Sequence, residues 1–239
     1  MSQGKAVALI AGGEFTRSWF TKLVRRQDPP VDISVVYANS LRVASRIANI
    51  LRAGKPVASL EAAAACAVLL IRVPEGQVEK LVAKLEKLDT EWKAKTVAVC
   101  DAREDSSVLR GLEKLGAHTA TLNVHQSGDS MYFVLEGADR AIAVLHRVLG
   151  IPRISALRVA TGQKGRFWRA MQVAEYVLPL AIAAERELRA AGLAREIASS
   201  LIEERIGAIA RYYRRAGRKG WKIDWAGALD QMERKFKAP

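Results

Sequence analysis

Short apolar runs alternate with amphipathic stretches over the first 150 residues of the chain. An uninterrupted apolar run is typical of a strand that is buried on both faces, and such runs lie at 6–10, 33–37, 67–73 and 96–100. Between them, apolar residues recur every three or four positions, which is the period of a helix. The alternation predicts an α/β fold with a mainly parallel sheet that is covered by helices on both faces.

The weaker patterns complete this α/β region. Shorter strand candidates lie at 56–58, 117–124 and 131–135. Helical spacing predicts helices at 40–54, 60–65, 77–88, 107–115 and 137–149.

The pattern changes after Pro152. A β-like stretch at 155–159 leads into a glycine-containing link, and a long helical pattern then covers 166–189. Pro179 lies inside this pattern and should kink the helix, because proline lacks an amide hydrogen and its ring clashes with the preceding turn. Further helices are predicted at 194–215 and 225–235. We therefore expect two domains, an α/β domain at 1–151 and an all-helical domain at 152–239.

The first forty residues have the order strand, glycine turn, helix, strand and polar tip, which is typical of a Rossmann dinucleotide-binding unit. The usual G-x-G-x-x-G fingerprint reads here as Ala11-x-Gly13-x-x-Thr16, so only its middle glycine is kept. The amides of Gly12 and Gly13 at a helix N-terminus would hold a pyrophosphate. The alternative is an ordinary strand-to-helix turn, in which glycine is common.

The end of the second strand indicates which dinucleotide would bind. An acidic residue there would bind the ribose hydroxyls of NAD and repel a 2′-phosphate. Instead the sequence reads Asn39-Ser40-x-Arg42, and a guanidinium suits a 2′-phosphate. The pattern favours NADP over NAD, with a solvated Arg42 as the alternative.

A second group of polar residues follows the later strands. Arg72 ends an apolar strand just before Val73-Pro74, and a charge there is costly unless it faces a cleft. Ligands bind at this carboxyl edge in open α/β sheets. Asp101 and His125 follow neighbouring strands at the same edge, and His125 has the pKa range of a general acid or base.

The chain is strongly basic, and the excess charge is uneven. Its net charge is +13, and residues 151–239 hold 18 Lys and Arg against 9 Asp and Glu. A basic surface favours anionic partners such as nucleotide phosphates, nucleic acid or an acidic membrane, although it can also serve solubility alone.

The basic excess is densest between Arg211 and Lys222, where six cations and three aromatic residues occur in twelve positions. Such a mixture can bind single-stranded nucleic acid by base stacking and phosphate contacts. The alternative is a helix end whose cations complement the helix dipole and whose aromatic rings pack on the domain.

The sequence gives little support for a membrane-spanning, secreted or metal-binding protein. No apolar run reaches the roughly 20 residues that span a bilayer, and the N-terminus lacks a signal-peptide pattern, so we expect a cytoplasmic protein that does not bind membranes. Cys66 and Cys100 lie in apolar runs and are expected to be buried thiols, with a disulfide or a reactive thiol as the alternatives. The three histidines are scattered without ligand spacing, and we predict no metal site.

Several short motifs give the chain a family resemblance. They include the βαβ start and segments through Val73-Pro74, Leu115-Gly116 and Glu136-Gly137. In their order and spacing the chain resembles bacterial Rossmann-like proteins with a C-terminal helical domain of unknown function. These belong to the 6-phosphogluconate dehydrogenase-like superfamily and are relatives of pyrroline-5-carboxylate reductase and ketopantoate reductase.

The resemblance implies an NADP-dependent oxidoreductase that acts on a small anionic carbonyl or imine compound, and a homodimer built by the helical domain. In such relatives the start of the long helix faces cofactor and substrate, so Lys164 and Arg169 are catalytic candidates. His125, at the carboxyl edge of the sheet, is a third candidate. Where the relatives have polar residues, this helix reads Trp168-Arg169-Ala170-Met171, which leaves a non-catalytic ligand-binding or dimerising protein as the alternative, along with nucleic-acid binding. The residues expected to bind the cofactor are Ala11, Gly12, Gly13, Glu14, Phe15, Thr16, Asn39, Ser40, Arg42, Arg72, Val73 and Pro74.

Overall fold

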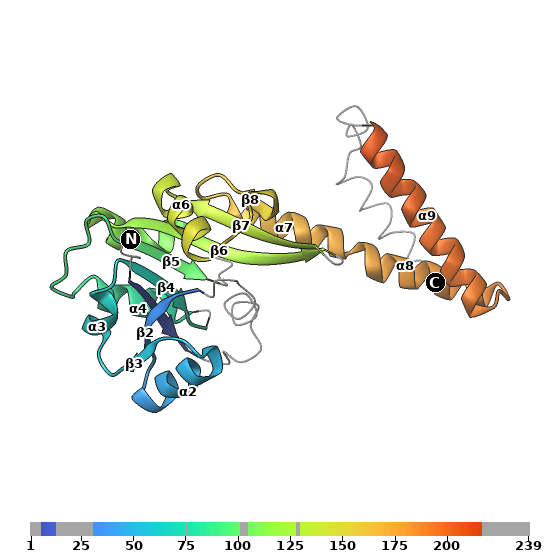
Figure 1. Cartoon of the computed structure of the whole chain (residues 1–239). Helices are drawn as coiled ribbons and strands as arrows, with labels where there is room; N and C mark the ends of the chain where they lie inside the picture. Colours follow the sequence, from blue (N-terminus) through green and yellow to red (C-terminus); the bar gives the residue numbers. More distant parts are fainter. Residues whose placement is uncertain (1–5, 13–30, 75, 101–104, 128–129, 217–239) are drawn as a thin grey trace. The chain divides into compact units, whose positions relative to one another are not determined.

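A computed structural model of the 239-residue chain describes residues 6–12, 31–74, 76–100, 105–127 and 130–216 (Figure 1). The chain divides into two compact units, Met1–Ala170 and Met171–Pro239, which are considered separately below. The helix expected between the glycine turn and the second strand and the helix expected at 225–235 lie outside the described residues.

The first unit is built on an eight-stranded sheet with the order β3-β2-β1-β4-β5-β6-β7-β8. Only β6 and β7 pair antiparallel, and every other neighbouring pair is parallel. The prediction of a mainly parallel sheet is therefore confirmed. The strands are β1 (Val7–Ala11), β2 (Ile33–Tyr37), β3 (Lys55–Val57), β4 (Val68–Arg72), β5 (Thr96–Cys100), β6 (His118–Ser127), β7 (Ser130–Gly137) and β8 (Ala156–Arg158).

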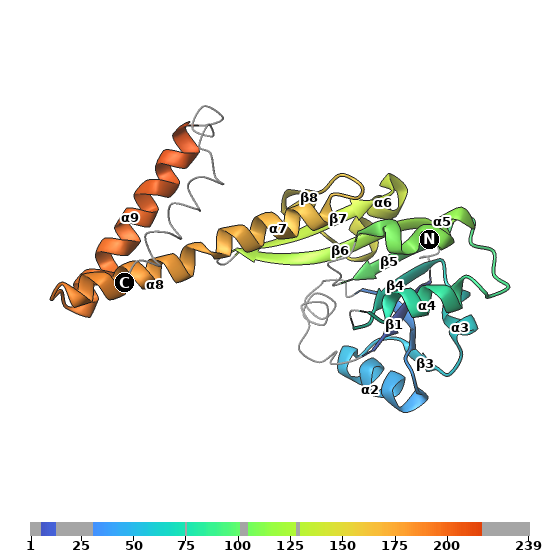
Figure 2. The same ribbon diagram turned by 180° about the vertical axis from the view of Figure 1, so that it is seen from behind.

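Helices cover both faces of this sheet, as can be followed in Figures 1 and 2. The stretch expected as one helix at 107–115 is a 3-10 turn followed by a short α-helix. The described helical segments of the first unit are α2 (Leu41–Leu51), α3 (Leu60–Ala64), α4 (Val78–Leu85), η1 (Ser106–Leu109), α5 (Arg110–Lys114), α6 (Asp139–Val148), η2 (Arg153–Ser155) and most of α7 (Lys164–Glu175).

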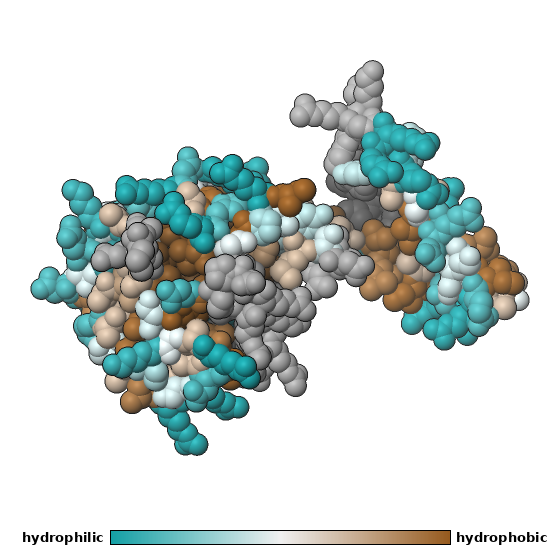
Figure 3. Space-filling model, in the orientation of Figure 1, coloured by the Kyte–Doolittle hydropathy of each residue, from teal (hydrophilic) through white to brown (hydrophobic). Residues whose placement is uncertain are grey.

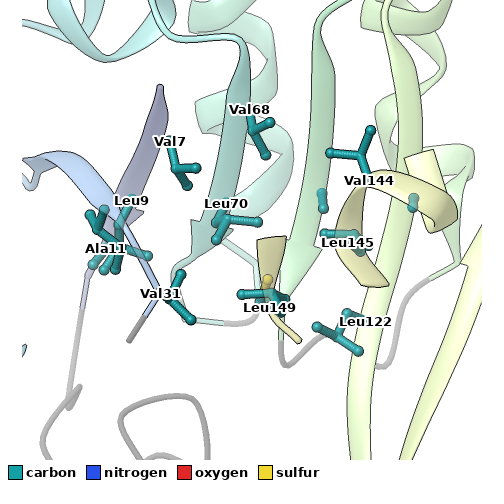
Figure 4. Packing of buried hydrophobic residues seen from close by; sticks show 14 of the residues in the cluster. Val7, Leu9, Ala11, Val31, Val68, Leu70, Leu122, Val144, Leu145 and Leu149 are labelled. Carbon is teal, nitrogen blue, oxygen red and sulfur yellow. The ribbon is translucent and has the colours of Figure 1, made fainter. Parts of the chain in front are cut away.

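The core lies in two layers, one on each face of the sheet. Successive side chains of β1 alternate between them, because the side chains of a strand point to opposite faces in turn. Leu9 and Ala11 pack in the layer under α2 and α6, whereas Ala8 and Ile10 pack in the layer under α3, α4 and α5. Figure 4 shows the first layer, in which Leu145 of α6 and Leu149, directly after α6, lie near the strands. Burial on both faces explains why the central strands read as continuous apolar runs.

Gly137 closes the antiparallel pair β6–β7 in a conformation that suits only glycine. Its φ is +128°, and a Cβ there would lie 2.4 Å from the carbonyl oxygen of Thr119 and 2.6 Å from the Cα of Ala120. Any side chain would therefore push β6 away from β7. This close approach gives a physical reason for the glycine that follows Glu136.

The long helix expected at 166–189 is two helices, α7 and α8 (Val177–Ala190), separated at Tyr176. The expected interruption is present, and it lies in the turn before Pro179, three residues earlier in the chain. Pro179 belongs to the first turn of α8, where an amide hydrogen would have no partner within the helix. The ring of Pro179 clashes with the backbone of the preceding turn, and α7 ends in that turn.

In the part that the structure describes, the second unit contains the end of α7, then α8 and α9 (Arg195–Ala216), with α8 and α9 packed against each other. The domain boundary was expected after residue 151, whereas the compact units divide after Ala170. The later division arises because β8 pairs with β7 and extends the sheet beyond residue 151. No described helix is long and apolar enough to cross a membrane.

Candidate functional site

The carboxyl ends of β1 and β4 meet at the centre of the parallel part of the sheet. The strand order reverses here, because β1 lies between β2 on one side and β4 on the other, and such a switch point forms the ligand crevice of open α/β sheets. The N–H of Gly12 donates to the carbonyl oxygen of Arg72 at 2.9 Å. A Cβ on Gly12 would lie 3.5 Å from both Val73 Cγ1 and Pro74 Cδ, which is ordinary contact, so packing alone does not require a glycine.

The tip of β2 leads directly into the N-terminus of α2. Asn39, Ser40 and Arg42 are all exposed there, and the first turn of α2 contains no acidic residue. The Ser40 hydroxyl caps the helix by accepting a hydrogen bond from the N–H of Val43 at 3.3 Å. The first-turn amides of Leu41 and Arg42 have no carbonyl partner inside the helix. The tip is therefore suited to bind an anion through amides, a hydroxyl and a guanidinium.

Arg72 is the last residue of β4 and pairs in register with Ala11 of β1. Its side chain is half-buried, and Ala11 is 3% exposed. Arg72 thus lies at the carboxyl end of β4 beside Ala11, with its side chain partly withdrawn from water.

Strand β6 extends beyond its parallel neighbour. Leu122 pairs with Cys100, the last residue of β5, so 123–127 continue past the end of the parallel strands. His125 lies in this extension and is half-buried. Its ring meets two aromatic rings of α7 edge to face, with centroid distances of 6.1 Å to Phe167 and 6.5 Å to Trp168. The aromatic wall formed by His125, Phe167 and Trp168 therefore joins β6 to α7.

The cations at the start of α7 differ in their exposure. Lys164, the first residue of the helix, is fully buried at 0% exposure, whereas Arg166 and Arg169 are exposed. Burial of an ammonium group is costly without compensating interactions. Lys164 therefore lies in the protein interior and is not presented to solvent. Arg169 is the candidate that a ligand arriving from solvent can reach.

Glu136 is a site residue that sequence reasoning noted only as part of a motif. It is fully buried, and both of its carboxylate oxygens accept hydrogen bonds. Oε2 accepts from the N–H of Ser106 at 2.6 Å and from the hydroxyl of Thr121 at 3.1 Å, while Oε1 accepts from the Ser106 hydroxyl at 2.8 Å and from the N–H of Gly162 at 2.9 Å. Glu136 thereby joins the start of η1 to the link that leads into α7. The sequence signal that could have identified Glu136 is an acidic residue inside an otherwise apolar strand.

A different electrostatic arrangement lies at the opposite edge of the sheet, before β4 and β5 begin. The Lys95 ammonium donates to the carbonyl oxygens of Ala65 and Cys66, at 3.2 and 3.0 Å. Burial raises the pKa of the Cys66 thiol, and the charge of Lys95 offsets only part of this rise. Burial also lowers the pKa of Lys95. A thiol with a raised pKa is a poor nucleophile, which favours a structural role for Cys66.

Some predicted residues lie outside the described part of the chain, namely Gly13, Glu14, Phe15, Thr16 and Asp101. Cys66 and Cys100 are both free and buried in the structure. Among the described residues, no group of three or more His, Cys, Asp or Glu side chains is arranged to hold a metal ion.

No protein-family model matches the chain, and no curated protein matches its sequence. Solved structures do share its fold. The imine reductase from Aspergillus terreus superposes with a TM-score of 0.69 at 14% identity, covering 92% of this chain and 78% of that one. The imine reductase from Myxococcus stipitatus in complex with NADP+ gives 0.62 at 15% identity, with coverages of 89% and 78%. The pyrroline-5-carboxylate reductase from Coxiella burnetii gives 0.57 at 14% identity, with coverages of 98% and 86%.

At these identities the similarity shows the fold alone. It confirms the fold that the family resemblance implied, a Rossmann-like α/β domain followed by C-terminal helices, as in pyrroline-5-carboxylate reductase and the imine reductases.

Proposed function

We propose that the carboxyl edge of the sheet binds NADP(H) and that the chain is an oxidoreductase acting on a small anionic carbonyl or imine compound. The observation that carries the proposal is the β2 tip, where Asn39, Ser40 and Arg42 are exposed beside a helix N-terminus with no acidic residue in its first turn. This combination suits a 2′-phosphate. Proteins of the same fold support the choice, since one imine reductase structure contains NADP+ and a reductive aminase structure contains NADPH and ethyl levulinate.

The order of the strands gives room for an extended dinucleotide. From β2 the edge passes over β1, β4 and β5 to β6, and four strand spacings amount to about 19 Å. The phosphate-binding tip lies at one end of this path, the crevice beside Gly12 in the middle, and the aromatic wall at the other end. The adenosine end is therefore assigned to β2 and the reacting end to β6.

The side chains at the β6 end have the chemistry that imine or carbonyl reduction requires. The bound cofactor would supply a hydride, and the protein must bind the substrate and provide a proton. His125 carries an imidazole, a common general acid and base in enzymes, and is half-buried against the aromatic wall, so we assign it the proton. Arg169 is exposed and is assigned to the substrate carboxylate, whereas the buried Lys164 is assigned to support of α7.

A titration of the purified chain tests the cofactor assignment. NADPH, NADH and adenosine 2′,5′-bisphosphate are compared by calorimetry, with inorganic phosphate as the control. We expect micromolar binding of NADPH and at least tenfold weaker binding of NADH. Arg42→Ala should remove most of this preference, whereas Arg110→Ala, an exposed arginine of α5, should leave it intact. Equal affinity for NADPH and NADH in the parent protein would contradict the 2′-phosphate assignment.

A non-catalytic ligand-binding protein is the second candidate. It is favoured by the burial of Lys164 and by Ala11 and Thr16 at two of the glycine positions of the fingerprint. Oxidation of NADPH in the presence of cyclic imine acids and 2-keto acids separates the two functions. Turnover supports the oxidoreductase, while NADPH binding without turnover on either class supports the second candidate.

We also propose that the chain forms a homodimer through the second unit. Several large apolar side chains of α8 and α9 are exposed, including Leu178 at 65%, Ile182 and Leu201, and Figure 3 shows apolar surface (brown) on these helices. A second copy would remove this surface from water.

A further inference from the structure

The C-terminal end of α9 presents charged and aromatic side chains together. Every residue from Arg211 to Arg215 is exposed, and the rings of Tyr212 and Tyr213 are 71% and 55% exposed. Aromatic side chains usually bury most of their large surface, so two neighbouring exposed rings on a helix need an explanation. The proposed oxidoreductase function uses none of these residues.

Helical geometry groups the three arginines on one face of α9, and Tyr212 lies beside this face. Arg211 and Arg215 are four residues apart and Arg211 and Arg214 three apart, so each pair lies on neighbouring positions of the helix surface. The Arg211 guanidinium extends back over Gly207, where its Nη1 lies 3.2 Å from the position a Cβ would take. Together these side chains form the basic–aromatic end of α9, defined as Arg211, Tyr212, Tyr213, Arg214 and Arg215.

The charged residues that neighbour this surface along the sequence are all positive. From Arg205 to Ile223 the sequence contains seven Lys and Arg and no Asp or Glu. The negative charges of α9 lie further back, at Glu196, Glu203 and Glu204. The basic–aromatic end is therefore a local positive field that includes exposed π surfaces.

We propose that the basic–aromatic end of α9 binds single-stranded nucleic acid. Arginine side chains neutralise backbone phosphates, and exposed tyrosine rings offer faces on which unpaired bases stack without sequence preference. An anionic membrane would also satisfy the arginines, but between Arg211 and Arg215 only the two tyrosines offer apolar surface, and the exposed apolar residues further back on α9 are assigned to the proposed dimer. This activity is independent of the dinucleotide site.

The test uses the full chain and a fluorescently labelled 20-nucleotide oligo(dT), with binding followed by anisotropy at several salt concentrations. Three phosphate contacts predict a slope of about −2 in log K against log salt, which is roughly a 20-fold loss of affinity between 50 and 200 mM NaCl. The triple variant Arg211→Gln, Arg214→Gln, Arg215→Gln should lose most of the binding and flatten this slope. Tyr212→Ala should weaken binding at least about fivefold with little change in the slope.

A matched control separates local contacts from net charge. The variant Arg110→Gln, Arg140→Gln, Arg147→Gln removes three exposed arginines of the first unit and lowers the net charge equally. We expect it to keep the affinity of the parent protein. The proposal is overturned if both triple variants bind equally, if the affinity does not depend on salt, or if vesicles with 30% phosphatidylglycerol bind the protein while oligo(dT) does not. NADPH binding should be unchanged in all these variants, so failure here and failure of the proposed function remain distinguishable.

Discussion

The carboxylate of Glu136 binds both the backbone N–H and the hydroxyl of Ser106, at 2.6 and 2.8 Å, in the interior of the first unit. Glu136 belongs to β7, whereas Ser106 begins η1, thirty residues earlier in the chain. The same carboxylate accepts from the N–H of Gly162, two residues before α7. This one side chain therefore links β7 both to η1 and to the segment that leads into α7.

Replacement of Glu136 by glutamine should destabilise the protein by about 3 kcal/mol. Each oxygen of the carboxylate accepts two donors, so either orientation of the glutamine amide places an NH2 group against other donors. Chemical denaturation measures the change in the free energy of unfolding. Glu113→Gln, at an exposed position of α5, is the control and should change it by less than about 0.5 kcal/mol. Equal effects would show that the buried carboxylate network contributes little.

Gly137→Ala should be more damaging than Gly12→Ala. A methyl group at Gly137 would lie 2.4 Å from the carbonyl oxygen of Thr119, and its φ of +128° is strained for any L side chain. At Gly12 the nearest atoms would be 3.5 Å away, at ordinary contact distance. We expect a loss of about 3 kcal/mol or more in the first variant and about 1 kcal/mol or less in the second, from thermal unfolding. A similar loss in both variants would contradict the close approach of β6 and β7.

His125→Asn tests the assignment of the proton donor. Removal of a general acid typically lowers the rate by two or more orders of magnitude, so kcat for the reductive reaction should fall about 100-fold while the Kd for NADPH stays constant. Phe167→Leu serves as a comparison, because it removes an aromatic neighbour of His125 without removing a titratable group. A kcat that survives in the asparagine variant would remove His125 from the mechanism.

The proposed dimer depends on the apolar surface of α8 and α9. The double variant Leu178→Glu, Ile182→Glu places two charges on this surface and should shift the chain from dimer to monomer in light scattering after gel filtration. Ile154→Glu changes another exposed apolar residue, in η2 of the first unit, and should leave the dimer unchanged. A parent protein that is monomeric at micromolar concentration would refute the dimer directly.

Cys66 and Lys95 should give opposite contributions to stability at alkaline pH. Burial raises the pKa of Cys66 above its ordinary value of 9.0, so above pH 9 the unfolded chain loses a proton that the folded chain keeps, and stability falls as the pH rises. Burial lowers the pKa of Lys95 below 10.5, so the folded chain loses its proton first, and stability rises towards that pH. Between pH 8.5 and 10.5, Cys66→Ala should therefore make the decline in unfolding free energy shallower, and Lys95→Met should make it steeper. Identical slopes in the parent protein and both variants would contradict these shifts.

Many elements could be located from local patterns alone. Strands at 33–37 and 96–100 were predicted with the bounds that the structure shows, and β4 within one residue. These strands are buried on both faces, so each leaves an uninterrupted apolar run in the sequence. The polar tip at Asn39–Arg42 was also visible, because it depends on which residues follow one strand.

Contacts between residues far apart in the sequence could not be predicted from local patterns. The sequence alone determined the alternation of strands and helices, the layered α/β class and the concentration of positive charge in the last third of the chain, since each depends on residue type and short-range period. Only the tertiary structure decided that Lys164 is buried, that His125 meets Phe167 and Trp168, and that Glu136 joins η1 to the link before α7. The hydrogen bonds and ring contacts among these relationships join residues 26 to 43 positions apart. Burial and pairing over such separations arise from packing rather than from the local sequence pattern.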